Sequence, residues 1–286
     1  MKELRDCVAV VTGAASGIGQ AMCRRFAGEG MRVVMADVEA TALEAARKEL
    51  AGAGREVIAV PTDVSQADQV SALAEKALEA FGRVHVVCNN AGVFAGGTSW
   101  EAPLSDYEWT FGVNLWGVIH GVRTFVPILL EHGEPSHVVN TASMAAVTRA
   151  PFVAAYYMSK HAVLTLSETL YLEMQAQDAP VGVSVLCPEL IDTGIGRSDR
   201  NRPPHLKRGQ GEEGGVGAMA DQVLREATPR GLDPSVMADR VVEAIREEQL
   251  YILSEEGGTW RQACDARLED LRLARNPTGG LLAGTN

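Results

Sequence analysis

The sequence has few cysteines, and no two of them stand close together. It contains no C-x-x-C pair and no H-E-x-x-H pair, and its single cysteines are Cys7, Cys23, Cys88, Cys187 and Cys264. Zinc sites need closely spaced ligands of these kinds, and disulfide frameworks are typical of short secreted chains. We therefore expect reduced thiols, no metal site and a cytoplasmic protein.

Excess positive charge and a long apolar run are also missing. The 286 residues include 26 Lys and Arg against 37 Asp and Glu, a formal net charge of -11. Binding to nucleic acid needs clustered cations, so this balance argues against it. We see no stretch approaching the roughly 20 apolar residues that cross a bilayer. Residues 1–6 lack the apolar core of a signal peptide. We expect neither a nucleic-acid partner nor a membrane partner.

What the sequence does have is a regular alternation of strand-like and helix-like segments. The hydrophobic fraction of 46% is enough for a core. The β-branched runs are at 7–12, 32–36, 57–60, 84–88, 137–140 and 181–186. The helical patterns are at 18–28, 39–50, 66–81, 107–131 and 155–177. This alternation predicts one α/β domain with a doubly wound parallel sheet, a Rossmann fold.

The alternation breaks after residue 188. Residues 194–231 are rich in glycine and charge, and we expect them to form a substrate loop that is mobile when empty and closes as a lid. The basic run 197–208 within them is typical of a solvated loop. A helix at 234–248 and a strand at 250–253 complete a domain of residues 1–255. Residues 256–286 form an extension, with a helix at 257–275 and a frayed tail.

A glycine-rich turn separates the first strand from the first helix. Its residues are Gly13, Ser16, Gly17, Ile18 and Gly19. Glycine permits the tight turn and the close approach of a pyrophosphate to the helix N-terminus. A plain glycine turn is the alternative, and the motifs downstream argue against it. This turn predicts a dinucleotide site.

Asp37 follows the second strand and bears on which dinucleotide binds. A carboxylate there can accept hydrogen bonds from the adenosine ribose. A phosphate on that ribose would face like charge, at a cost of about 1–4 kcal/mol for charges some 4 Å apart. The neighbouring Val38 and Glu39 offer no compensating cation. The sequence therefore predicts NAD rather than NADP.

Tyr156 and Lys160 stand four positions apart, on one face of a predicted helix. Free tyrosine has a pKa of about 10 and is a poor base near neutrality. Lowering its pKa by ~3 units requires about 4 kcal/mol, which Lys160 and a positive nicotinamide ring could supply. Ser143 lies upstream and would hold the substrate oxygen. Tyr157 is the rival, but it lacks the four-residue spacing to Lys160.

These motifs resemble those of the short-chain dehydrogenase/reductase family, TGxxxGxG for the nucleotide and YxxxK for catalysis. The resemblance covers about residues 5–253 and implies a homodimer or homotetramer, formed through the helix that carries Trp109 and Trp116. Core packing is the alternative for these two tryptophans. The resemblance also implies that Asn114 joins Ser143, Tyr156 and Lys160 in catalysis, by holding a water of a proton relay.

Further cofactor contacts follow from the same resemblance. It implies that Lys160 and Tyr156 contact the nicotinamide side and that Thr193 meets the carboxamide. It implies that Asp63 contacts the adenine, with Val64 next to it. It also implies that Asn90, Ala91 and Gly92 support the sheet and the ribose on the nicotinamide side, and that Pro188 contacts the cofactor in the last turn. For Asn90 we rank a structural role first. Glu189 replaces the family's glycine after Pro188, which leaves the role of this turn open.

The substrate is the least determined part. Beside Ser143, the flanking residues Phe94, Met144, Phe152, Glu189 and Leu190 are mostly apolar. They favour a bulky hydrophobic, aromatic secondary alcohol or its ketone. A narrower resemblance, in residues 112–119 and 251–253, is to bacterial dehydrogenases of benzylic alcohols from lignin aryl ethers. An NAD-binding sensor without turnover, a reductase of a steroid-like or other bulky ketone, and a non-redox lyase or epimerase stay open.

Overall fold

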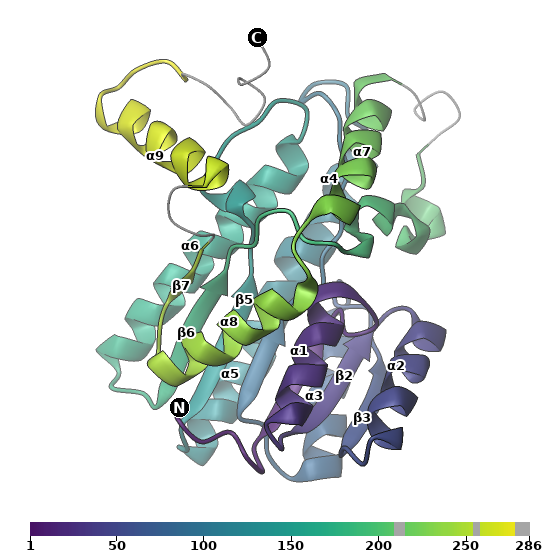
Figure 1. Cartoon of the computed structure of the whole chain (residues 1–286), viewed down its shortest axis with the longest axis vertical. Helices are drawn as coiled ribbons and strands as arrows, with labels where there is room; N and C mark the ends of the chain where they lie inside the picture. The colour runs from purple at the N-terminus through teal and green to yellow at the C-terminus, as the bar shows by residue number, and fades with distance from the viewer. Residues whose placement is uncertain (209–214, 254–257, 278–286) are drawn as a thin grey trace.

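The computed structural model describes residues 1–208, 215–253 and 258–277. Over these residues the chain forms a single seven-stranded parallel sheet in the order β3-β2-β1-β4-β5-β6-β7 (Figure 1). The strands are β1 (Val8–Thr12), β2 (Arg32–Asp37), β3 (Val57–Pro61), β4 (Val86–Asn89), β5 (Ser136–Thr141), β6 (Val181–Leu186) and β7 (Tyr251–Ile252). The central strands are buried along their length because helices cover both faces. The predicted doubly wound sheet is confirmed.

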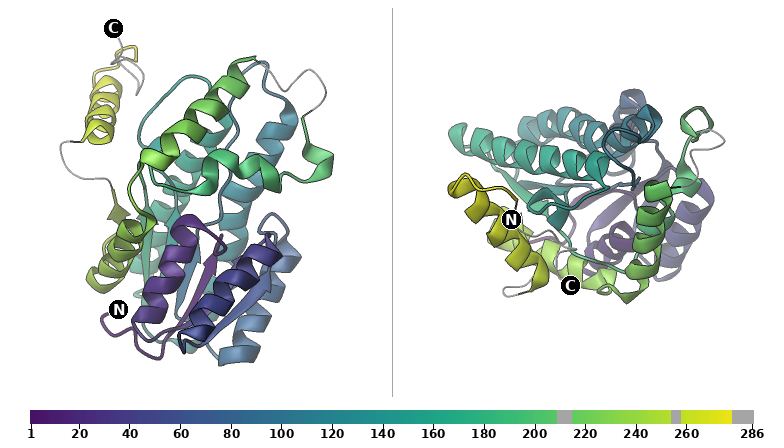
Figure 2. Two further views of the ribbon diagram at one scale, coloured as in Figure 1. Left: turned by 45° about the vertical axis from the view of Figure 1, so that its right-hand side comes forward. Right: turned by 90° about the horizontal axis from the view of Figure 1, so that it is seen from above.

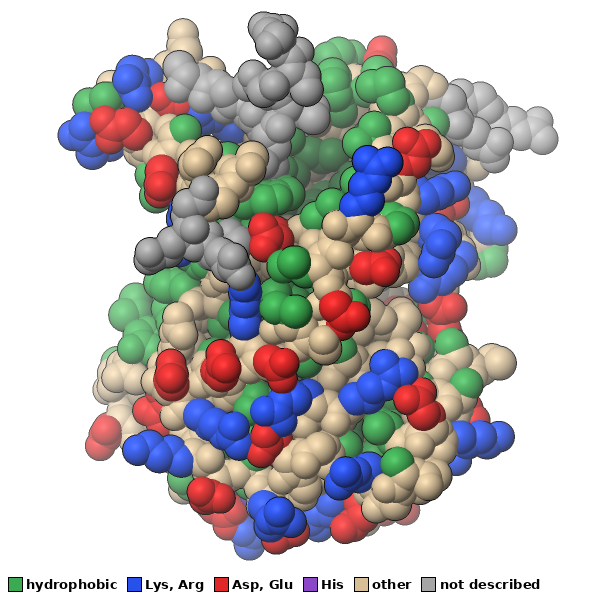
Figure 3. All heavy atoms as spheres, in the orientation of Figure 1, with side chains coloured by type: hydrophobic (Ala, Val, Ile, Leu, Met, Phe, Trp, Pro, Cys, Tyr) green, Lys and Arg blue, Asp and Glu red, His purple; other side chains and the backbone are tan. Residues whose placement is uncertain are grey.

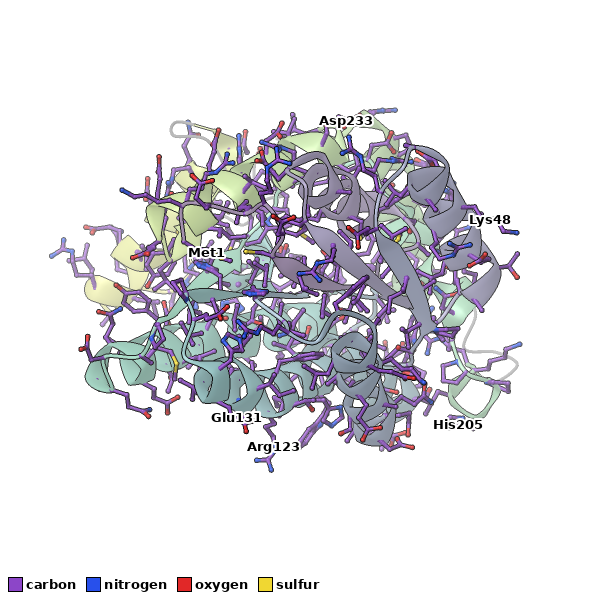
Figure 4. The ribbon with its side chains drawn as sticks, turned by 90° about the horizontal axis from the view of Figure 1, so that it is seen from below. Met1, Lys48, Arg123, Glu131, His205 and Asp233 are labelled. Carbon is purple, nitrogen blue, oxygen red and sulfur yellow. The ribbon has the colours of Figure 1, made fainter. Side chains whose placement is uncertain are left out.

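Two helical layers enclose the sheet. The helices are α1 (Gly17–Gly28), α2 (Ala40–Gly52), α3 (Ala67–Phe81), α4 (Leu104–Phe111), α5 (Gly117–His132), α6 (Ala154–Ala176), α7 (Gly215–Ala227), α8 (Pro234–Glu247) and α9 (Thr259–Arg272). One apolar core lies between the sheet and α1, α2 and α8, and another lies between the sheet and α3, α5 and α6. Figure 2 shows the two layers from above. In Figure 4, Arg123 and Glu131 of α5 lie opposite Asp233, at the start of α8.

The helix expected at 107–131 differs from its prediction in two ways. It is interrupted by a π-helical turn at Gly112–Trp116, which a 3.6-residue pattern does not reveal. Counted as one stretch, Leu104–His132 is also long and apolar enough to cross a membrane, contrary to our expectation. It packs against β4, β5, α3 and α6, and is therefore a core helix.

Much of the excursion after β6 is helical. It contains the 3₁₀ turns Gly194–Asn201, Pro204–Leu206 and Thr228–Arg230, together with α7. These elements lie above the carboxyl edge of the sheet (Figure 1). The positions expected for the middle of the lid, 209–214, lie outside the described residues, as does the tail at 278–286. Whether the excursion moves stays a prediction.

The interpretation of 197–208 as a solvated basic loop is wrong for Arg202. This side chain is buried, and its Nη1 donates to Asp106 Oδ1 of α4 at 2.7 Å. Its guanidinium also lies 4.2 Å from the ring centroid of Trp109. Arg208 reaches the other oxygen of Asp106 from 2.9 Å. The excursion is thus fastened to α4 by a buried ion pair whose partners are far apart in the sequence.

The surface away from this edge carries interspersed charges. Figure 3 shows acidic and basic side chains mixed over the lower half of one face, with more hydrophobic side chains toward the upper part. Ion pairs such as Arg24–Glu49 and Arg25–Asp239 join α1 to α2 and α8. Such exposed pairs contribute little to stability. We therefore expect the functional site at the carboxyl edge of the sheet and not on this surface.

Candidate active site

A cavity of about 620 Å³ lies at the carboxyl edge of the sheet. It is lined by almost every residue predicted to bind the cofactor, namely Gly13, Ser16, Gly17, Ile18, Asp37, Asp63, Val64, Asn90, Ala91, Gly92, Tyr156, Lys160, Pro188 and Thr193. Parallel strands bring their loops to one edge, which is why residues spread over the chain meet here. Gly19 is the exception, because it is buried against the strand below.

The glycine turn has no room for side chains at its glycines. Gly13 and Gly17 have φ values of 67° and 54°, which other residues rarely adopt. A Cβ at Gly17 would lie 2.9 Å from Thr193 Cγ2, and one at Gly19 would lie 2.1 Å from Gly13 O. The side chain of Ser16 does not cap the start of α1. The helix N-terminus therefore suits a pyrophosphate, and the residues fit a bound dinucleotide.

Asp37 and Asn90 hold the walls of this cavity in place. Asp37 Oδ2 accepts from Ala15 N at 3.0 Å, which ties the end of β2 to the glycine turn. Asn90 Nδ2 donates to Thr12 O at 3.0 Å, and Asn90 Oδ1 accepts from Thr141 at 3.3 Å. These bonds join the ends of β1, β4 and β5. The structural role that we ranked first for Asn90 agrees with these contacts.

The hydroxyl of Ser143 is close enough to the phenol of Tyr156 to affect its pKa. Ser143 follows β5, and its Oγ also accepts from Ala145 N at 3.1 Å, which starts a short 3₁₀ turn. Burial raises the pKa of Tyr156 to about 12, although the hydroxyl of Ser143 lowers it in part. Tyr157 is instead close to Thr148, whose hydroxyl affects its pKa. Of these two tyrosines, Tyr156 is the one that lines the cavity and is in position to exchange a proton there.

Lys160 is almost completely buried one helical turn from Tyr156. Its Nζ donates to Thr141 O at 3.0 Å and lies 5.7 Å from the centroid of the Tyr156 ring. Burial lowers the pKa of Lys160 to about 8. Lys160 and Ser143 alone therefore do not produce the expected lowering of the Tyr156 pKa, because the desolvation of the phenol outweighs their effect.

Asn114 fastens the catalytic helix to the sheet. It lies in the π turn, where its Oδ1 accepts from Val93 N at 2.8 Å and its Nδ2 donates to Val93 O at 2.9 Å. Nδ2 also donates to Ser159 Oγ at 3.2 Å, and Ser159 in turn donates to Tyr156 O at 2.7 Å. Sequence reasoning missed Ser159, since a lone serine in a helix gives no signal. The proton-relay role of Asn114 stays a prediction.

The residues predicted to contact substrate separate into three groups. The ring of Phe94 packs against that of Tyr156, with centroids 5.2 Å apart. Met144 is fully buried in a core cluster, and its contact with substrate stays a prediction. A residue flanking a motif can point either way, which the sequence does not show. Glu189, Leu190 and Phe152 do not line the described cavity, and neither do Ser143, Phe94 and Met144.

Comparison with known proteins places these features in one family. A family model described as short chain dehydrogenase matches residues 7–203. The chain is 45% identical over 197 residues to 1-deoxy-11-beta-hydroxypentalenate dehydrogenase of Streptomyces avermitilis, covering 68% of this chain and 72% of that one. It is 31% identical over 255 residues to C alpha-dehydrogenase of Sphingobium sp. strain SYK-6, covering 88% and 82%.

A solved structure agrees over nearly the whole chain. It is a short chain dehydrogenase/reductase from Burkholderia phymatum in complex with NAD, with a TM-score of 0.93 and 45% identity. The match covers 98% of this chain and 99% of that one. The sheet order, the glycine turn and the placement of Tyr156 and Lys160 at one cavity, with Ser143 near Tyr156, support the same assignment. The chain belongs to the short-chain dehydrogenase family of oxidoreductases that act on CH–OH groups.

Proposed function

We propose that this protein uses NAD to interconvert a bulky hydrophobic, aromatic secondary alcohol and its ketone. The observation that carries the proposal is that Tyr156, with Ser143 near it, lines the same cavity as buried Lys160, the glycine turn and Asp37. A binding-only sensor would not need a phenol and a serine hydroxyl close together at this position. The catalytic arrangement thus favours turnover over sensing.

The proposed reaction divides between proton transfer and hydride transfer. A bound NAD would supply the acceptor for the hydride of the alcohol carbon in oxidation, and NADH would supply the hydride for the ketone carbon in reduction. Ser143 donates to the substrate oxygen and holds it beside Tyr156. In oxidation the Tyr156 phenolate removes the alcohol proton, and in reduction the phenol returns a proton to the ketone oxygen.

Tyr156 can act as a base near neutrality only if its pKa falls by several units from about 12. Each unit corresponds to about 1.4 kcal/mol. Lys160 is held by Thr141 O so that its charge stays near the phenol. The positive charge of an oxidised nicotinamide would act in the same direction. Two cations beside a buried phenol therefore oppose the cost of its desolvation.

The substrate class is supported by the surroundings of Tyr156. Phe94 offers an aromatic face beside the phenol, and a small cluster of Val93, Ala95, Trp109 and Leu206 makes the neighbouring wall apolar. Two relatives named as dehydrogenases of a hydroxypentalenate and of a C alpha position support an alcohol substrate. Reduction of a steroid-like or other bulky ketone is the alternative within the same class.

The preference for NAD is supported by Asp37, which lines the cavity, and by the NAD complex of the Burkholderia relative.

A homodimer or homotetramer through α4 and α5 is supported by Trp116, which is half exposed, whereas Trp109 is buried. Sedimentation of the wild type would measure the assembly.

A substrate panel tests the proposed function. The enzyme is assayed for NADH formation with aromatic, aliphatic and sugar alcohols, and for NADH consumption with the matching ketones. We expect the highest kcat/KM for bulky aromatic secondary alcohols or their ketones. Best activity on small polar alcohols would contradict the substrate class, and no turnover of any substrate with tight NADH binding would favour the sensor.

A further inference from the structure

A cation missing from the local sequence binds Glu39, two residues after Asp37, in the folded chain. Arg200 comes from the turn after β6, and its Nε and Nη2 donate to Glu39 Oε1 at 3.1 and 2.6 Å. Asn201 Nδ2 donates to the same oxygen at 2.9 Å. Asp37, Glu39 and Arg200 line one cavity, although Arg200 is 161 residues from Glu39. The sequence-based view that no cation serves this position is therefore incomplete.

Each of the three nitrogens of the Arg200 guanidinium donates to a protein acceptor. Besides the two bonds to Glu39, its Nη1 donates to Gly194 O at 3.1 Å and to Arg197 O at 2.9 Å. Burial alone would raise the pKa of Glu39, but hydrogen bonds from Arg200 and Asn201 lower it below its usual range. Glu39 is thus ionised near neutral pH. Its carboxylate forms an ion pair with Arg200 in the wall of the cavity that Asp37 also lines.

The pair remains accessible to a competing anion. The side chains of Arg200 and Glu39 are 39% and 28% exposed, so neither is sealed in the core. A guanidinium prefers a phosphate or carboxylate that it can meet with two parallel hydrogen bonds. A phosphate on the adenosine ribose would compete with Glu39 for the same nitrogens, and it would also be repelled by the charges of Glu39 and Asp37.

We propose that Glu39 is a second determinant of cofactor specificity, which excludes NADP by holding Arg200 away from a phosphate on the adenosine ribose. This inference rests on the proposed function, in which Asp37 lies next to that ribose. The carboxylate of Asp37 repels a phosphate on the adenosine ribose. The carboxylate of Glu39 also repels that phosphate, and it binds Arg200, whose positive charge could otherwise offset the repulsion. The specificity then depends on a contact between the loop after β2 and the turn after β6.

The test measures binding without turnover. NADH and NADPH are titrated into each variant, and their fluorescence gives the dissociation constants. Three variants are compared: Asp37→Ala, Asp37→Ala with Glu39→Gln, and these two together with Arg200→Leu. Beginning from Asp37→Ala removes the repulsion already assigned to Asp37. Any further gain in NADPH affinity then reports on Glu39.

We expect Glu39→Gln in the Asp37→Ala background to tighten NADPH binding at least about tenfold, the worth of a charge-assisted hydrogen bond of about 1.4 kcal/mol. NADH affinity should change much less, because NADH lacks the phosphate. Adding Arg200→Leu should abolish the gain. A matched control is Glu49→Gln, which removes one acidic charge from the exposed pair with Arg24 and should leave the NADPH to NADH ratio unchanged.

Two results would overturn the role of Glu39. One is unchanged NADPH affinity on Glu39→Gln, and the other is a gain that survives Arg200→Leu, which would show loss of repulsion alone. Failure of the proposed NAD preference gives a different result. In that case the wild type itself binds NADPH as tightly as NADH, before any substitution is made.

Discussion

The buried carboxylate of Asp106 should be costly to remove, although it lies outside the catalytic centre. Asp106 and Arg202 are each 2% exposed, and their closest atoms are 2.7 Å apart. Arg208 binds the second oxygen at 2.9 Å. Removing one partner of a buried ion pair typically costs about 3–5 kcal/mol, because the other charge stays buried without its counter-ion. Asp106→Asn keeps the shape of the side chain and removes only the charge.

The structure places the expected loss at the lower end of that range. Arg202 retains Asp199 at 2.7 Å, and Arg208 retains Asp221 at 2.9 Å. We therefore expect Asp106→Asn to lower the free energy of unfolding by about 3 kcal/mol. Urea denaturation followed by tryptophan fluorescence measures this, and Trp109 beside Arg202 contributes to the signal.

An exposed pair provides the control. Asp239 pairs with Arg25 at 2.7 Å, and the two side chains are 58% and 33% exposed. Asp239→Asn should cost less than about 1 kcal/mol, because water screens such pairs. Limited proteolysis within residues 194–231 should also be faster in Asp106→Asn than in Asp239→Asn. Equal losses of stability in the two variants would refute the reasoning.

Three further predictions follow from the site. The pKa of Lys160 is about 8 in the folded protein, against 10.5 for a free lysine. Between these pH values the unfolded state binds more protons than the folded state. The free energy of unfolding should therefore rise with pH over this range, by up to about 3 kcal/mol. Denaturation of Lys160→Met at several pH values should show that this rise is lost. Gly17→Ala places a Cβ 2.9 Å from Thr193 Cγ2 at a φ of 54°, so the affinity for NADH, measured by fluorescence, should fall. An unchanged affinity would contradict a pyrophosphate site at the glycine turn. Phe94→Ala removes the ring beside Tyr156 and should raise KM for aromatic alcohols more than for small aliphatic ones; equal effects would argue against an aromatic pocket.

The sequence predicts the fold and the cofactor cavity well because the signals are local. Buried parallel strands require continuous apolar runs, and the run 181–186 coincides with β6. The glycine turn and the pair of Tyr156 and Lys160 depend on spacing along one segment. Their meeting at one cavity follows from the topology, since parallel strands deliver their loops to the same edge.

What the sequence does not predict are contacts between distant segments. The pairs of Glu39 with Arg200 and of Asp106 with Arg202 join positions about a hundred or more residues apart, and spacing carries no record of them. The basic run after β6 therefore resembles a solvated loop although part of it is buried. Burial of Met144 and the raised pKa of Tyr156 depend on packing and desolvation, which only the folded chain determines.

The central claim is that Tyr156 exchanges the proton during hydride transfer. Its most direct test is kcat of Tyr156→Phe, measured as NADH formation on the best alcohol of the panel, with NADH affinity measured alongside and Tyr157→Phe as the matched control. We predict a loss of at least about 10²-fold in kcat for Tyr156→Phe, the usual contribution of a positioned acid or base, with NADH still bound and Tyr157→Phe nearly unaffected. Near-normal turnover in Tyr156→Phe, or an equal loss in Tyr157→Phe, would contradict the account.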